Sequence, residues 1–149
     1  MNPIAFYILL ALVAGACLPT QAGINVHLGL WTRSSVLAAA ISFAVGTLAL
    51  IAYALGTRIP LPAAEGLAGR PWWIWSGGVL GAFFVTATVI LAPRLGAAAM
   101  LALIIAGQMV ASLLLDHFGL LGYAVHPVNG WRMLGVALLV AGVVLIRRF

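Results

Sequence analysis

Charge is what this sequence has least of. Only 6% of its 149 residues are charged, none is a lysine, and the acidic side chains are Glu65 and Asp116 alone. A soluble globular domain usually has about 25% charged residues. The composition therefore excludes an ordinary water-soluble domain.

Cysteine and histidine are almost as scarce. The single Cys17 excludes an internal disulfide and argues against a cysteine-rich metal site; we expect it to be a small buried residue of the first helix. The three histidines, His27, His117 and His126, lack the close spacing of metal ligands. No nucleophile–base pair, phosphate-binding loop or cluster of carboxylates is recognisable. The sequence thus predicts no metal, no cofactor and no enzymatic activity.

Hydrophobic residues are abundant, at 65% of the chain, and they form five long runs. A helix that crosses a bilayer needs about 20 residues, so five helices account for roughly 100 of them. The sequence predicts an all-α membrane protein, a single integral membrane domain over residues 1–149 without a separate soluble part. The expected helices cover approximately residues 3–30, 36–56, 72–91, 97–117 and 128–146.

The seven basic residues are all arginines, and they stand at the ends of the apolar runs. This placement favours contact with lipid phosphates and a role in membrane orientation, and it argues against nucleic acid as a partner. Arg132, near the start of the last helix, is expected to extend toward the headgroups. All five tryptophans fall at predicted span ends, which is typical of aromatic belts at the bilayer surface.

The fourth predicted helix carries a polar stripe. Gln108, Ser112 and Asp116 are spaced i, i+4 and i+8, which puts them on one side of a helix with a drift of about 40° per step. Polar groups are costly in hydrocarbon, so such a stripe normally faces protein or a water-filled cavity. For Gln108, lining of a solute pathway and simple bonding between helices stay open as alternatives.

The first predicted helix is longer than the bilayer requires, and we expect Pro19 to break or bend it. Gln21 and Asn25 follow and are four residues apart, so they share a face. A kinked helix with freed backbone groups and two amides can form part of a binding site. The alternatives are that these amides bond across helices or that residues 24–31 already lie at the interface.

Asp116 and His117 are adjacent near a predicted helix end, and three interpretations stay open. They can form a titrating pair that couples transport to protons, since a histidine and a carboxylate shift each other's pKa. They can instead cap the following turn or pair with an interfacial arginine. Their position at the edge of the bilayer favours the two structural roles.

The distribution of arginines hardly distinguishes the two sides of the membrane. Five spans put the termini on opposite sides, with three arginines on one side and four on the other: Arg58, Arg70 and Arg132 against Arg33, Arg94, Arg147 and Arg148. Because an arginine bias normally sets orientation, this chain is free to insert both ways. Two opposed copies would form an inverted repeat, the symmetry of many alternating-access transporters. We therefore expect an antiparallel homodimer. The alternative is a single orientation fixed by the order of folding or by unequal burial of the loops.

Several motifs resemble the YdcZ-type family of the drug/metabolite transporter superfamily. They are Gly15-x-x-Leu18-Pro19-x-Gln21-Ala-Gly23-Ile-Asn25, Trp73-x-Trp75-x-Gly77-Gly78-x-x-Gly81-Ala82, Gly107-Gln108 and Asp116-His117-Phe-Gly119. The resemblance implies a five-helix protein of the bacterial cytoplasmic (inner) membrane, from a family that occurs as dual-topology single units, as opposite-orientation pairs or as fused duplicates. For this chain we expect dual topology. Two chains would then form an antiparallel, inverted-repeat bundle of ten helices.

Glycines mark the surfaces at which helices are expected to pack. Gly77 and Gly81 form a G-x-x-x-G pair, which permits close approach of two helices. The last helix, with Gly135 and Gly142, resembles the terminal dimerisation helix of small multidrug-resistance transporters. Those transporters also carry a glutamate in the first helix, whereas this chain has Gln21 and Asn25 there. Proton-coupled export of cationic drugs by that mechanism is therefore not expected.

The preferred function is a secondary transporter of a small polar metabolite. Its substrate-binding residues are predicted to be Gln21, Asn25, Gln108 and Ser112, uncharged hydrogen-bonding groups that suit a polar or zwitterionic solute better than a bare cation. A dual-topology channel and a non-transporting accessory subunit are the alternatives. A carrier is slower than a channel because each turnover needs a conformational step.

Overall fold

The computed structural model describes residues 3–60 and 70–148, and all regular structure in these ranges is helical. Glu65 and most of the loop expected at 57–71 lie outside the described residues. The elements are α1 (Pro3–Thr32), α2 (Ser35–Gly56), the short 3₁₀ turn η2 (Trp72–Trp75), α3 (Ser76–Leu95), α4 (Ala97–Phe118), the 3₁₀ turn η3 (Leu120–Gly122) and α5 (Gly130–Arg148). Five helical segments are long and apolar enough to cross a membrane, which confirms the predicted number of spans.

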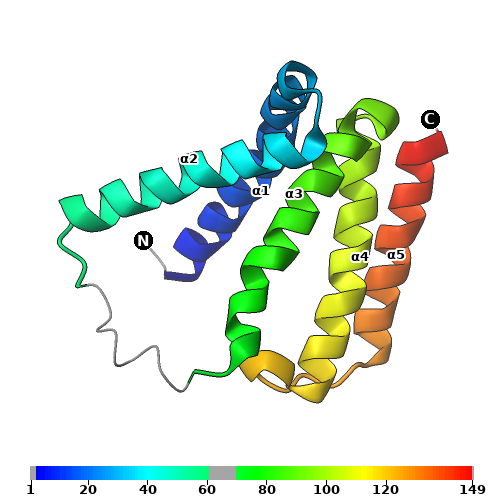
Figure 1. Ribbon diagram of the computed structural model, residues 1–149. Helices are drawn as coiled ribbons and strands as arrows, with labels where there is room; N and C mark the ends of the chain where they lie inside the picture. The colour runs from blue at the N-terminus through cyan, green and yellow to red at the C-terminus, as the bar shows by residue number, and fades with distance from the viewer. Residues whose placement is uncertain (1–2, 61–69, 149) are drawn as a thin grey trace. The chain divides into compact units, whose positions relative to one another are not determined.

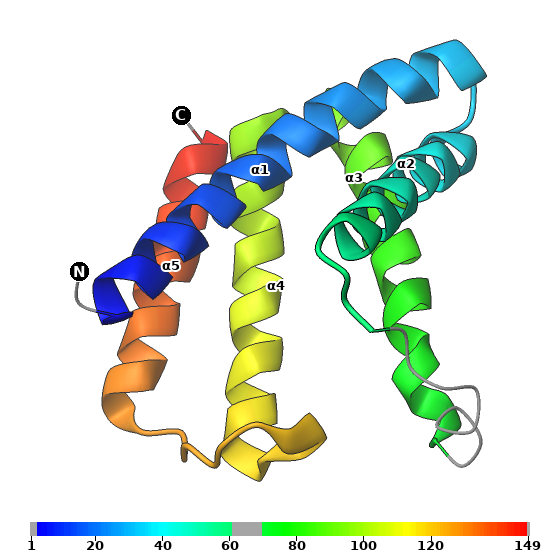
Figure 2. The same cartoon turned by 90° about the vertical axis from the view of Figure 1, so that its left-hand side faces the viewer.

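The chain forms two compact units, Met1–Pro93 and Arg94–Phe149. In the first unit, α1 and α2 pack against each other near the turn that joins them, and they diverge away from it (Figures 1 and 2). In the second unit, α4 and α5 lie side by side and antiparallel (Figure 1). Each unit is thus built on a helical hairpin.

Small residues hold the first unit together near the α1–α2 turn. Gly29 of α1 lies so close to α3 that an added Cβ would be 2.9 Å from Cγ1 of Val89. Small side chains allow helix backbones in a membrane to approach closely. The buried residues of this unit are Ala22 and Asn25 on α1, Ala38 and Ala39 on α2, and Val85, Thr88 and Val89 on α3.

Of the four glycines predicted to mediate packing, Gly81 has a neighbour within the chain. A Cβ at Gly81 would lie 3.1 Å from Cζ of Phe43, so this glycine makes room for the Phe43 ring of α2. At Gly77, Gly135 and Gly142 an added Cβ would meet no described atom within 4 Å. Their role in contact with another subunit stays a prediction.

Most of the apolar surface is uncovered. In the most apolar 18-residue window of each span, between 0% and 17% of the residues are buried. Large side chains such as Leu12, Phe83 and Trp131 are 67%, 74% and 82% exposed. Apolar surface on this scale needs lipid or another protein chain to cover it.

Two prolines, Pro19 and Pro93, lie inside helices. α1 continues through Pro19 as one helix of 30 residues, so Pro19 does not break the helix; the alternative, a bend at Pro19, stays a prediction. α3 continues through Pro93 to Leu95, beyond the predicted end at residue 91. Membrane helices tolerate proline because neighbouring groups satisfy the freed backbone atoms. The break between α3 and α4 occurs instead at Gly96, whose φ of 77° leaves the helical region.

The end of α4 requires glycine for two reasons. Gly119 adopts the left-handed conformation (φ 60°, ψ 33°), and its N–H bonds to the carbonyl of Leu115. An added Cβ would also lie 2.7 Å from Cγ2 of Val125, which folds back over the turn. Glycine is the residue that adopts this conformation without a steric cost.

We expect Gly119→Ala to lower the free energy of unfolding by about 2–3 kcal/mol, through backbone strain and the clash together. Gly122→Ala is the matched control, since Gly122 has a φ of 86° but open space around it. In Gly122→Ala, backbone strain alone should lower the free energy of unfolding by about 1–2 kcal/mol. Denaturant unfolding in detergent micelles measures both; equal losses would show that the contact with Val125 adds nothing.

Candidate functional site

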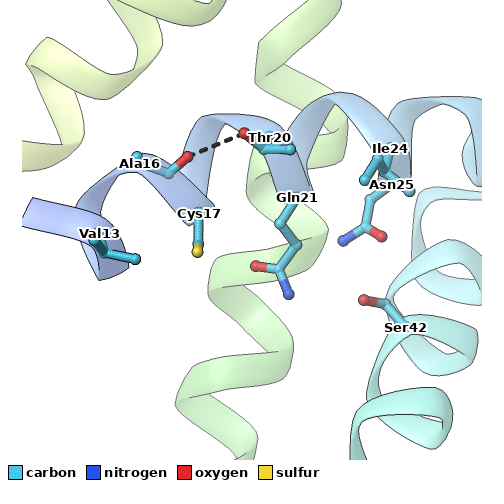
Figure 3. A pocket seen from close by; sticks show the side chains of 8 residues that line it. All are labelled: Val13, Ala16, Cys17, Thr20, Gln21, Ile24, Asn25 and Ser42. Atoms are coloured by element: carbon cyan, nitrogen blue, oxygen red, sulfur yellow. Dashed lines mark hydrogen bonds between the residues drawn. The ribbon is translucent and has the colours of Figure 1, made fainter. Parts of the chain in front are cut away.

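An open hollow of about 500 Å³ lies along α1 and reaches α2. Figure 3 shows Gln21 and Asn25 extending from the same side of α1, with Ser42 of α2 facing them. The lining consists of Val13, Ala16, Cys17, Thr20, Gln21, Ile24, Asn25 and Ser42. Two of the four predicted substrate-binding residues are therefore brought together at one site.

Asn25 is the most unusual residue of this hollow. Its exposed fraction is 2%, and its Nδ2 atom has no hydrogen-bond partner among the described residues. No other buried side-chain polar atom of residues 3–60 and 70–148 is in this condition. An unsatisfied buried donor costs about 1–3 kcal/mol, so it calls for an explanation, such as a water, an ion or a functional role.

The position of Asn25 follows from the spacing of α1. Ala22, Asn25 and Gly29 are three and four residues apart, so they share the face that packs near the α1–α2 turn. Gln21 lies one residue before Ala22 and is exposed at the edge of that face. One amide is thus buried and the other accessible, although both line the same hollow.

Three polar residues of the hollow were not predicted as binding residues. Ser42 is not among the predicted binding residues, yet it faces the two amides (Figure 3). The hydroxyl of Thr20 donates to the carbonyl of Ala16 at 3.0 Å, so its oxygen can act only as an acceptor for a ligand. Cys17 is exposed, which corrects the expectation that it is buried. No sequence signal on α2 alone points to Ser42, because its role depends on the facing helix.

Gln108 and Ser112 lie on α4, in the second unit, and both are exposed. They are one helical turn apart and share a face, as predicted. Neither belongs to the lining of the α1–α2 hollow. Their contribution to a common binding site with Gln21 and Asn25 stays a prediction.

Asp116 and Arg132 join the end of α4 to the first turn of α5. Their side chains form an ion pair with 2.8 Å between Oδ2 and Nη2. The other guanidinium nitrogen of Arg132, Nη1, donates to the carbonyl of His126 at 2.8 Å. The His126 N–H in turn donates to the backbone carbonyl of Asp116 at 2.9 Å. We call this set, Asp116, His126 and Arg132, the α4–α5 clasp.

His117 takes part in the same connection. Its Nδ1 accepts a hydrogen bond from the N–H of Val128 at 3.2 Å. Asn129 then caps α5 by accepting from the N–H of Arg132 at 2.9 Å. The two structural interpretations of Asp116-His117, pairing with an arginine and capping of the turn, thus both have a geometric basis. Arg132, expected to extend toward lipid headgroups, is instead engaged in the clasp.

Within residues 3–60 and 70–148, no three histidine, cysteine, aspartate or glutamate side chains lie close enough together to bind a metal ion. The chemistry that the described groups offer is hydrogen bonding by amides, hydroxyls and a thiol on membrane-length helices. Such an arrangement can recognise a solute without transforming it.

Comparisons with known proteins agree with this description. Residues 6–145 match the family described as "Putative inner membrane exporter, YdcZ". The Inner membrane protein YdcZ of Escherichia coli (strain K12) is 36% identical over 77 residues, which are 52% of this chain and 51% of that protein. The chain thus spans about half the length of this curated relative, and no solved structure matches it.

The family description is consistent with the expectation that the chain is not an enzyme. It also agrees with five apolar helices that are long enough to span a bilayer, which make the chain a multi-pass protein of the inner membrane. On a match that covers nearly its whole length, the chain belongs to the YdcZ family of the drug/metabolite transporter superfamily.

Proposed function

We propose that the chain is one subunit of a secondary transporter for a small polar metabolite. The description of the family as an inner-membrane exporter supports this function and favours export over import. Five membrane-length helices within the described residues are consistent with it. Two opposed copies would work by alternating access around a common cavity.

The hollow on α1 and α2 is the observation that carries the proposal. It lies on two membrane-length helices and contains two amides, two hydroxyls and a thiol. Polar groups at such positions are costly unless a polar partner meets them. In our proposal, the partner that Nδ2 of Asn25 lacks among the described residues is supplied by the substrate. Gln108 and Ser112 of α4 are proposed to bind substrate as well.

The antiparallel homodimer rests on three features of the chain. The arginines are balanced at three against four, so neither orientation is strongly preferred. The spans are largely unburied, which leaves surface for a second copy. Gly135 and Gly142 are seven residues apart on one face of α5, with open space before them. This face would let two α5 helices approach closely.

In this proposal, Asp116 and His117 stabilise the connection between α4 and α5, and a role in proton coupling is not required of them. A coupling role would require the ion pair with Arg132 to open during each cycle, because a protonated Asp116 no longer attracts the guanidinium. The same opening would release the α4–α5 clasp. Coupling by this pair stays a prediction that the proposed transport does not depend on.

A stabilisation screen followed by flux measurement tests the function. Metabolites that bind the purified chain in lipid nanodiscs should raise its melting temperature. For the best of them, flux into proteoliposomes should saturate with concentration, at a turnover of about 10³ per second or less. Faster flux that does not saturate would identify a channel instead. An absence of both stabilisation and flux would identify an accessory subunit.

A further inference from the structure

We propose that the α1–α2 hollow selects an uncharged solute that has an apolar part and an oxygen acceptor, and that this oxygen binds Nδ2 of Asn25. The inference deepens the proposed transport function and rests on it. It narrows the substrate class, because it excludes zwitterions as well as cations and anions. Asn25, Gln21 and Ser42 supply the recognition.

The first step is the unused donor. Nδ2 of Asn25 carries two N–H groups, and no acceptor in the described chain bonds to either of them. The Thr20 hydroxyl, nearby on the same helix, already donates to Ala16. A ligand that satisfies Asn25 must bring an acceptor such as a carbonyl, ether or hydroxyl oxygen. Because Nδ2 is itself buried, the amide has to shift toward the hollow to meet this oxygen. Figure 3 shows the amide of Asn25 between Gln21 and Ser42, so the same ligand can reach both.

The second step is the absence of charge around the hollow. The lining contains no acidic or basic side chain, and neither α1 nor α2 contains an aspartate, glutamate, lysine or arginine. A charged solute that enters would lose its hydration without gaining a counter-charge, which is strongly unfavourable in an apolar environment. A zwitterion would lose the hydration of two charges. An uncharged solute avoids this loss.

The third step is the composition of the remaining wall. Val13, Ala16 and Ile24 present apolar side chains beside the polar group. A ligand that is polar over its whole surface would leave hydroxyls against these side chains. The lining instead fits a molecule with one polar edge and one apolar edge, which is how small-molecule sites usually combine orientation with burial.

The thiol of Cys17 can be used to detect binding of a solute in the hollow. Cys17 is the single cysteine of the chain, it is exposed, and it lines the hollow. A bound solute should therefore shield its thiol from N-ethylmaleimide. Four leucine derivatives differ in charge: N-acetyl-L-leucinamide is neutral, N-acetyl-L-leucine is an anion, L-leucinamide is a cation and L-leucine is a zwitterion. The two acetylated probes match each other in shape, and so do the two without the acetyl group.

With the full chain in lipid nanodiscs, we expect the neutral probe, at about 20 mM, to slow alkylation of Cys17 about threefold, as for a site two-thirds occupied. Each of the three charged probes should slow the alkylation of Cys17 clearly less than the neutral probe does. Equal protection by all four, or protection by none, overturns the proposal. A Cys17→Ala, Ala124→Cys double variant places the thiol on an exposed loop of the other unit and should show no protection by any probe.

Two substitutions of Asn25 sharpen the test. Asn25→Leu keeps the approximate size but removes the donor, so the neutral probe should lose its effect while alkylation without probe stays unchanged. The melting temperature without probe should rise, because an unsatisfied buried donor has been removed. Asn25→Asp replaces the donor by an anionic acceptor and should transfer protection to the cation, L-leucinamide. A lower melting temperature and loss of the dimer in Asn25→Leu would show that a partner subunit satisfies Asn25, and would overturn the proposal.

Failure of this inference is distinguishable from failure of the transport function. Saturable flux of a metabolite without charge-selective protection of Cys17 would leave the transporter in place and refute the selectivity of the hollow. Charge-selective protection without flux would leave the binding site in place and refute transport.

Discussion

Transport should fall more than tenfold when two lysines are added to the loop of residues 57–71 and Arg94 is replaced by glutamine. These changes convert the balance of basic residues from three against four into five against three, which should fix one orientation. An antiparallel dimer cannot form from copies that all insert the same way. Flux of the solute identified by the stabilisation screen measures the loss.

The decisive comparison is with a variant whose excess of basic residues lies on the other side of the membrane. Leu95→Lys with Ala97→Lys changes the balance to three against six, and should fix the other orientation with the same loss of transport. Co-expression of the two variants should restore most of the flux, because each supplies the orientation that the other lacks. Reporters fused to the C-terminus, active on one side of the membrane only, verify the orientation of each variant.

The control for both variants replaces each added lysine by glutamine at the same position and keeps every native arginine, which preserves the length of the loop but not the added charge. Its transport should equal that of the native chain. Full transport by a variant that inserts in one orientation only would refute the antiparallel dimer. A failure of co-expression to restore transport would do the same.

The second large effect is expected at the α4–α5 clasp. Asp116→Ala should lower the free energy of unfolding by about 2 kcal/mol, because it removes a hydrogen-bonded ion pair and leaves the guanidinium of Arg132 with one protein partner. The side chains of Arg132 and Asp116 are 32% and 26% exposed. Solvent therefore weakens the pair only in part, and the loss exceeds that of a typical surface ion pair.

A charge exchange separates the ion pair from other effects of the substitution. Asp116→Arg with Arg132→Asp should recover about half of the loss, since the pair is rebuilt while the bond from Arg132 to the His126 carbonyl is not. Arg147→Ala, at the other end of α5, should cost less than about 1 kcal/mol. Thermal unfolding in detergent micelles compares the four proteins. Equal losses in Asp116→Ala and Arg147→Ala would show that the clasp does not stabilise the connection.

The number of spans could be predicted because it depends on local properties of the chain. Runs of about 20 apolar residues are recognisable without knowledge of their neighbours, and α1 to α5 lie within a few residues of the expected ranges except at Pro93. The shared face of Gln21 and Asn25 is equally local, because it follows from the helical repeat. The prolines misled the prediction, since the penalty that ends a helix in water is reduced where neighbouring groups satisfy the backbone.

The contacts between helices could not be predicted in the same way. In a soluble helix the apolar stripe identifies the packed face, but α1 and α2 carry apolar residues on every side. Their packed faces are marked instead by small residues such as Gly29 and Ala38, which are common throughout the chain. That is why Cys17 was interpreted as buried and Ser42 was not predicted to line a site.

By itself, the sequence determined that this is a membrane protein and how many times the chain can cross the bilayer. It also determined that the few polar side chains are concentrated on the first and fourth helices. Only the tertiary structure decided which of those side chains meet. It set Ser42 opposite the amides of α1, buried Asn25 without a partner, and joined Asp116 to Arg132 across a turn of the chain. The face that a residue occupies on a helix depends only on residues close to it in sequence, whereas contact between two helices depends on how the side chains of both pack together.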